Sequence, residues 1–132
     1  LNGALAGLVA ITAEPLTPGP ITAMFIGSIG AVIMYFGTKM LESYGLDDVV
    51  GAIPVHMFAG IFGTLVVPLT NSDTTFGTQF IGTASVCLFS FGLSWITFTI
   101  LKSTIGLRIS KAAEKLGTDK AEVGVTAYSI RD

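Results

Sequence analysis

Residues 47–67 read DDVVGAIPVHMFAGIFGTLVV, an acidic pair followed by a run that contains no further acid, lysine or arginine. The only side chain in this run that titrates readily is the imidazole of His56. A membrane-spanning helix needs roughly 20 predominantly apolar residues. The run therefore predicts a helix that crosses a bilayer over about residues 49–67, with one titratable group inside it.

Two other stretches have the same character. No acid, lysine or arginine lies between Glu14 and Lys39 or between Asp73 and Lys102. The spans that these intervals predict cover about residues 21–40 and 80–101. The whole chain is 51% hydrophobic and 12% charged, whereas a soluble domain carries about 25% charged residues. We therefore expect an all-α integral membrane fold.

The segments around the predicted spans are short. Residues 1–13 are apolar but too few to cross a bilayer, and they fit the last part of a helix. The stretch EPLTPGP at residues 14–20 favours a turn, because proline has no backbone N–H to donate. Polar connections are predicted at residues 41–48 and 68–79. Residues 1–101 thus form the predicted transmembrane segment.

The sequence becomes polar after the last predicted span, and residues 102–132 form a predicted tail. Within this tail, SKAAEKLG at residues 110–117 predicts a short polar helix that ends at a glycine, where a left-handed cap forms easily. Residues 118–132 are predicted to be irregular.

The basic residues predict the orientation of the chain. If the three predicted spans alternate in direction, all seven lysines and arginines fall on one side of the bilayer. Basic residues near the ends of spans favour the cytoplasm. We therefore expect a multi-pass protein of the cell membrane with a cytoplasmic C-terminal tail. The seven residues are Lys39, Lys102, Arg108, Lys111, Lys115, Lys120 and Arg131.

His56 is the candidate functional residue, because ionisable groups at membrane depth are costly and usually face the protein interior or a water path. Helical spacing places mostly alanine and glycine around it, which predicts a helix-packing face or a narrow lumen wall. Its neighbours at this spacing are Val49, Ala52, Ile53, Ala59, Gly60 and Gly63. Two hypotheses remain open: a polar step in a transport path, or a side chain that bonds a neighbouring helix and holds the bundle together.

Two residues near His56 shape the start of its helix. Pro54 cannot donate to the carbonyl of Val50, so this carbonyl is left free and the helix is expected to bend. Asp48 precedes the span and is expected to be a solvated acid at a helix start, where negative charge is favourable, with a functional role as the alternative.

Several kinds of chemistry are not supported by the sequence. One imidazole without a second ligand at suitable spacing cannot form a metal site, so no metal or cofactor is expected. No serine or cysteine nucleophile has a partner, which argues against an enzyme, and no basic stretch predicts nucleic-acid binding. The single cysteine, Cys87, lies in an apolar run and is interpreted as a small buried hydrophobic residue.

Three stretches resemble the Amt/MEP ammonium transporters. The first is NGALAGLVAIT at residues 2–12, and the second is the acidic pair with the V-H-x-x-x-G core formed by Val55, His56 and Gly60. The third is STIGLRIS at residues 103–110, followed by a glycine-rich tail signature. That signature consists of Gly117, Asp119, Gly124, Ala127 and Tyr128.

The resemblance implies an eleven-helix membrane bundle, of which this chain would be the C-terminal portion from part of the eighth helix through the cytoplasmic tail. His56 would be the second of two histidines that line a hydrophobic pore for ammonium or ammonia. Helix packing beside this pore would involve Ala52, Pro54, Gly60 and Gly63, and Gly106 and Arg108 would form the tail root. The implied partners are the lipid bilayer, two further copies in a homotrimer and a PII-type regulator at the tail.

The tail differs from the family pattern at two positions, where Val123 and Val125 replace a frequent histidine and glutamate. Two other kinds of protein remain as alternatives to a transporter. One is an ammonium sensor of the same fold, and the other is a membrane scaffold subunit in which His56 is purely structural.

Overall fold

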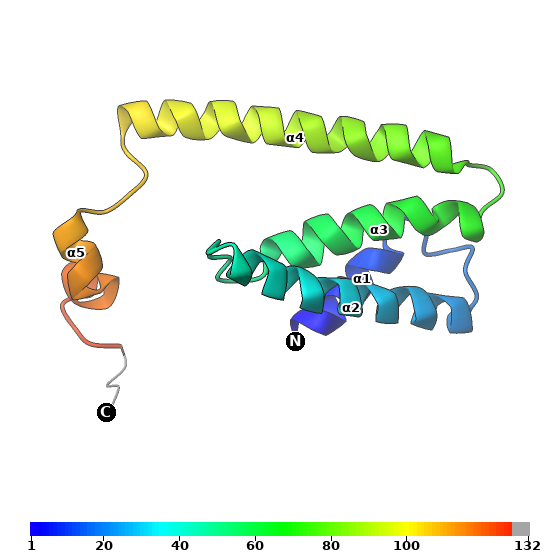
Figure 1. Cartoon of the computed structure of the whole chain (residues 1–132), viewed down its shortest axis with the longest axis horizontal. Coiled ribbons are helices and arrows are strands. Elements are labelled where there is room, and N and C mark those ends of the chain that lie inside the picture. Colours follow the sequence, from blue (N-terminus) through cyan, green and yellow to red (C-terminus); the bar gives the residue numbers. More distant parts are fainter. Residues whose placement is uncertain (128–132) are drawn as a thin grey trace. The chain divides into compact units, whose positions relative to one another are not determined.

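The computed structural model describes residues 1–127, and every regular element in that range is a helix (Figure 1). The predicted all-α class is therefore confirmed for these residues. The elements are α1 (Asn2–Ile11), α2 (Pro20–Ser43), η1 (Ile53–Phe58), α3 (Ala59–Val66), η2 (Val67–Leu69), α4 (Phe76–Thr104), α5 (Lys111–Leu116) and η3 (Asp119–Val123).

Two of these helices, α2 and α4, are long and apolar enough to cross a membrane. They contain most of the two uncharged intervals, Glu14 to Lys39 and Asp73 to Lys102, from which the spans at about 21–40 and 80–101 are predicted. The third predicted span corresponds to a shorter continuous helical segment, Ile53–Leu69, which joins η1, α3 and η2. Contacts within the chain define two units, one formed by residues 1–89 and the other beginning at Ser90.

Helices α1, α2 and α3 pack side by side in the first unit (Figure 1). Their packing relies on glycine and alanine, as is common between membrane helices because small residues let backbones approach. At one crossing, a Cβ placed on Gly7 would lie 3.1 Å from the carbonyl oxygen of Gly27. Ala6, Val55 and Ala59 form the buried centre, each at most 2% exposed.

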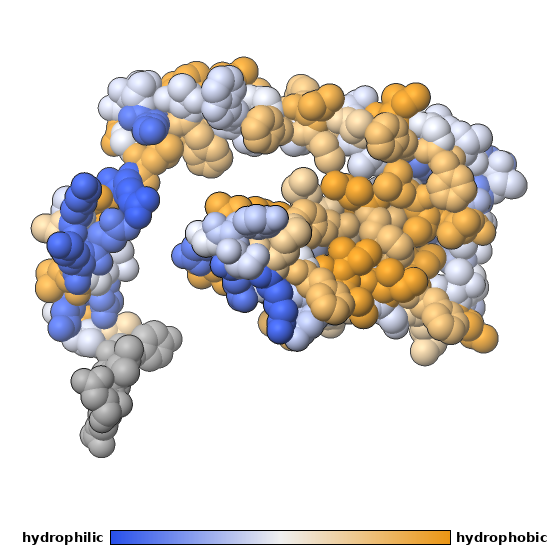
Figure 2. Space-filling model, in the orientation of Figure 1, coloured by the Kyte–Doolittle hydropathy of each residue, from blue (hydrophilic) through white to orange (hydrophobic). Residues whose placement is uncertain are grey.

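Many large apolar side chains of this unit are exposed. Figure 2 shows apolar side chains gathered over α2, with hydrophilic side chains at its C-terminal end and over α5. On α2 the exposed apolar side chains include Ile21, Met24, Phe25 and Phe36, which are 64% to 72% exposed. In water such a surface would be strongly unfavourable, so it suits contact with lipid or with other helices.

The predicted boundaries of the 49–67 span and the 68–79 connection need correction. The helix starts at Ile53 because residues 48–51 form a turn, and it continues through the 3₁₀ turn η2 to Leu69. The connection is shortened further because α4 begins at Phe76, where Thr75 acts as a cap: its Oγ1 accepts from the backbone N–H of Thr78 at 3.2 Å.

The short tail helix is confirmed. Ser110 caps α5 by accepting from the backbone N–H of Ala113 at 3.2 Å, and Gly117 ends it with φ of +93°. The prediction of an irregular chain after residue 118 is wrong for residues 119–123, which form the π-helical turn η3. The carboxylate of Asp119 accepts from the backbone N–H of Ala127 at 2.8 Å, a bond that draws the following residues back to this turn and lowers the pKa of the carboxyl. Tyr128 and Arg131 lie outside the described residues.

The close contact between α3 and α1 gives a first testable prediction. A Cβ added to Gly63 would clash with the backbone oxygen of Ala10, whereas one added to Gly60 would meet Val9 at an ordinary 3.6 Å. We expect Gly63→Ala to destabilise the complete protein by about 1–3 kcal/mol, as overpacking does. Thermal unfolding in detergent measures this effect.

The matched control is Gly60→Ala, which should leave the unfolding midpoint within error of the wild type. Equal midpoints for both variants would show that the helices do not approach as closely as described.

Candidate functional site

His56 lies on a π-helical turn, Ile53–Phe58, at the point where the sequence predicts a bend. The backbone N–H of Ala59 donates to the carbonyl of Pro54, five residues earlier, which is the bonding pattern of a π-helix. Such turns are rare and are frequently found at functional sites. The imidazole is exposed on the surface of this chain.

Within this chain, the packed face of this helix lies beside His56 and does not include it. The prediction of either a helix-packing face or a narrow lumen wall at His56 stays a prediction. The buried residues are Pro54, Val55, Ala59 and Gly63, while Gly60 is half-buried and Ala52 is exposed. A π-turn closes over five residues instead of four. The helical spacing used to place the neighbours of His56 therefore does not hold across residues 53–58.

The buried side of the turn contacts both α1 and α2. A Cβ placed on Gly37 of α2 would lie 3.3 Å from the Cβ of Pro54 and 2.5 Å from the ring of Phe58. On the α1 side, Val55 packs into the cluster with Ala6 and Ala59. These contacts hold one side of the turn and leave the side that carries His56 uncovered within this chain.

Asp48 caps the start of the π-turn. Its two carboxylate oxygens accept hydrogen bonds from the backbone N–H groups of Ala52 at 2.9 Å and Ile53 at 2.7 Å. The first N–H groups of a helix have no partner within the helix, and a negative charge is favourable at this end. Asp48 thus has the helix-starting position that the sequence predicts, and it holds that position through two hydrogen bonds to backbone N–H groups.

The carbonyl of Val50 cannot accept a hydrogen bond from Pro54, which has no N–H. It accepts one from a side chain on another helix instead. The side-chain amide of Asn2, at the start of α1, donates to this oxygen at 3.0 Å. The sequence predicts the free carbonyl of Val50 but contains no local pattern that identifies Asn2 as its donor. The available signal was a single amide side chain at the edge of an otherwise apolar stretch.

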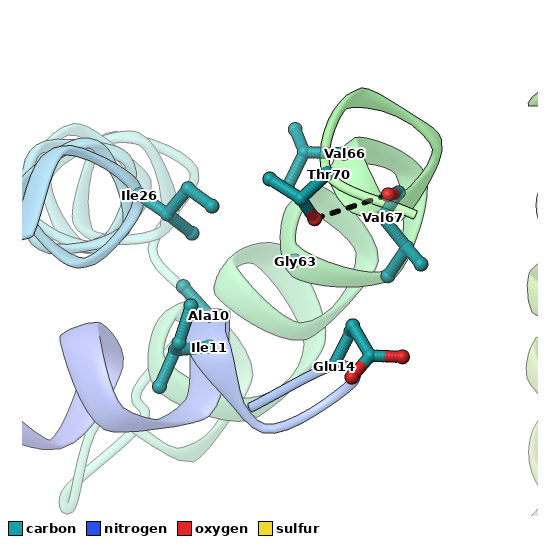
Figure 3. Close-up of a pocket in the computed structure, with 8 residues that line it drawn as sticks. All are labelled: Ala10, Ile11, Glu14, Ile26, Gly63, Val66, Val67 and Thr70. Atoms are coloured by element: carbon teal, nitrogen blue, oxygen red, sulfur yellow. Dashed lines mark hydrogen bonds between the residues drawn. The ribbon is translucent and has the colours of Figure 1, made fainter. Parts of the chain in front are cut away.

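A small pocket lies at the opposite end of α1, α2 and α3 (Figure 3). The carboxylate of Glu14 accepts from the amide of Asn71 at 2.9 Å, a bond that lowers the pKa of this carboxyl, and from the backbone N–H of Leu16 at 3.2 Å. The pocket has room for about one water molecule. Its lining residues are Ala10, Ile11, Glu14, Ile26, Gly63, Val66, Val67 and Thr70.

The tail root contains an ion pair. Gly106, with φ of +81°, ends α4 by donating its N–H to the carbonyl of Leu101 at 3.0 Å. Arg108 then holds the carboxylate of Glu114 through both Nε and Nη2. The hydrogen bond from this guanidinium lowers the pKa of Glu114, and the same bond raises the pKa of Arg108. In residues 1–127, no three His, Cys, Asp or Glu side chains gather as a metal site requires.

The helices and the site together define part of an all-helical membrane protein with an accessible imidazole on an apolar helix. The sequence profile of the Ammonium Transporter Family matches residues 1–128. The chain belongs to this family. Its members are membrane transporters and not enzymes, as the sequence indicates.

Named relatives support this membership. The chain is 39% identical over 147 residues to the ammonium transporter Amt2 of Archaeoglobus fulgidus, with 96% of this chain and 31% of the relative covered. It is 35% identical over 135 residues to Amt2 of Methanocaldococcus jannaschii, covering 96% and 32%. It is 32% identical over 145 residues to the ammonium transporter of Corynebacterium glutamicum, covering 98% and 32%.

The chain spans a quarter to a third of the length of the relatives that it matches. The expectation that it is the C-terminal portion, from part of the eighth helix through the tail, is corrected. The family match runs over residues 1–128 of this 132-residue chain, and it shows a part of a family member without placing that part at the C-terminal end.

The cap at the start of the π-turn gives a second prediction. We expect Asp48→Ala in the complete protein to destabilise the fold by about 0.5–2 kcal/mol, because the backbone N–H groups of Ala52 and Ile53 lose their acceptor. Thermal unfolding in detergent measures the loss. Asp48→Asn retains one acceptor oxygen and should lie between Ala and wild type.

The neighbouring acid supplies the control for this experiment. Asp47→Ala changes the same charge one residue earlier, and we expect a much smaller effect. If Asp47→Ala destabilised the protein as much as Asp48→Ala, simple charge and not capping would explain the result.

Proposed function

We propose that this chain forms part of an ammonium channel or transporter, and that His56 lines a hydrophobic pore through which ammonium or ammonia crosses the membrane. The family membership and the names of the relatives support the substrate. The observation that carries the role of His56 is its position: an exposed imidazole on a π-turn within an apolar helix.

The chemistry of the imidazole suits this task. An ammonium ion in an apolar passage without partners would lose its hydration at a cost of tens of kcal/mol. A neutral imidazole offers one hydrogen-bond donor and one acceptor, so it can accept from ammonium and assist its deprotonation. An alkali ion has no proton to release and gains little from the same group. The imidazole thus provides a physical basis for selectivity.

The complete protein is proposed to be a multi-pass bundle of eleven helices in the cell membrane. The other walls of the pore would come from segments outside this chain, facing the side of the π-turn that α1 and α2 leave uncovered. The distribution of basic residues supports a cytoplasmic tail. We further propose that the complete protein forms a homotrimer and that its tail contacts a PII-type regulator.

The direct test is substitution of His56 in the complete protein. We expect His56→Ala to reduce uptake of methylammonium by about tenfold or more, since a hydrogen bond to a charged group contributes about 1.5–3 kcal/mol and each 1.4 kcal/mol is a factor of ten. Discrimination between ammonium and potassium should fall as well. Uptake into cells and potassium competition measure the two quantities.

A suitable control is Met57→Ala, which truncates an adjacent side chain that is 50% exposed and cannot exchange a proton. Its effect on the discrimination should be small. Wild-type uptake together with wild-type discrimination in His56→Ala would refute the role of His56 and would favour a sensor or scaffold in which this residue is structural.

A further inference from the structure

Two features of the backbone just before the π-turn mean that hydrogen bonds within its own helix do not fix its conformation. Pro54 has no N–H, so the carbonyl of Val50 has no donor at the usual helical position. Gly51 adopts φ of +73°, a region that other residues rarely enter. This carbonyl lies on an exposed turn and takes its donor from outside the helix, so that contact helps to set the path of the chain at this point.

That contact comes from Asn2, 48 residues away in the sequence. Its Nδ2 donates to the carbonyl of Val50 at 3.0 Å. The approach requires glycine at the next position, since a Cβ on Gly51 would lie 2.6 Å from the same Nδ2. Glycine at position 51 therefore serves two purposes: it permits the positive φ, and it leaves space for the amide of Asn2.

The start of the turn is held in two ways. Asp48 accepts from the N–H groups of Ala52 and Ile53 from within the segment, and Asn2 donates to Val50 from α1. Val55, one residue before His56, packs against Ala6 on the same α1 helix. A functional side chain must be held within about 0.5 Å of its working position, and these contacts connect the position of His56 to α1.

We propose that Asn2 is a positioning residue for His56: its amide fixes the carbonyl of Val50 and thereby sets where the π-turn places the imidazole. This inference rests on the proposed function of His56. The type of side chain at position 2 matters, because it must reach the carbonyl of Val50 and donate a hydrogen bond to it. Aspartate has nearly the same shape but presents an acceptor to an acceptor.

The test compares Asn2→Asp with the wild type in the complete protein, by the amount of folded protein, methylammonium uptake and the discrimination between ammonium and potassium. We expect uptake per folded molecule to fall about tenfold or more, and discrimination to shift by at least about threefold toward that of His56→Ala. A purely structural role would lower the amount of protein without changing discrimination.

Thr12→Val is the matched control at the C-terminal cap of α1, because it removes a hydroxyl that donates to the carbonyl of Leu8 on α1 at 2.7 Å. It should change neither uptake per molecule nor discrimination. If Asn2→Asp does not fold, Asn2→Ala takes its place with the same measurements, and failure of both to fold would assign Asn2 to folding and overturn the proposal.

The outcomes separate the two proposals. If His56→Ala transports and discriminates as the wild type does, the proposed pore role fails. If His56→Ala loses discrimination while both Asn2 variants keep it, the pore role stands and the positioning role of Asn2 is overturned.

Discussion

The structure around His56 depends on one missing hydrogen-bond donor, the N–H that Pro54 lacks. The carbonyl that proline leaves free, that of Val50, has no donor from its own helix and lies on an exposed turn. The chain meets this constraint with the amide of Asn2, and the adjacent N–H groups take the carboxylate of Asp48 as their acceptor. The π-turn that follows exposes an imidazole on one side while its other side is buried.

The small residues of the first unit make this arrangement possible. The bond from Asn2 to Val50 requires α1 to approach the start of the π-turn, and Gly63 allows the same helix to approach α3 at Ala10. Gly37 makes room for Pro54 and Phe58 on the α2 side. Close packing among α1, α2 and α3 thus supports the turn, and apolar side chains on the outer surface remain for lipid or other helices.

The sequence predicts the parts of this fold that depend on composition. Long intervals without charge predict the positions of α2 and α4. The polar stretch 110–117, which ends at a glycine, predicts the position of α5. The sequence also predicts that Pro54 frees the carbonyl of Val50. The π-turn could not be predicted, because spacing rules assume an ordinary helix. Of the small residues that ordinary spacing places beside His56, Ala59 and Gly63 are buried, whereas Ala52 is exposed. The partnership with Asn2 joins residues distant in sequence, and no local pattern contains it.

The central claim is that His56 faces a water-poor passage through the membrane, and its location in the complete protein tests this most directly. A cryo-electron microscopy map of that protein in a lipid nanodisc would locate the ring. We expect the imidazole to border a narrow passage between helices. An imidazole in contact with acyl chains, or in bulk solvent with no passage beside it, would contradict the account.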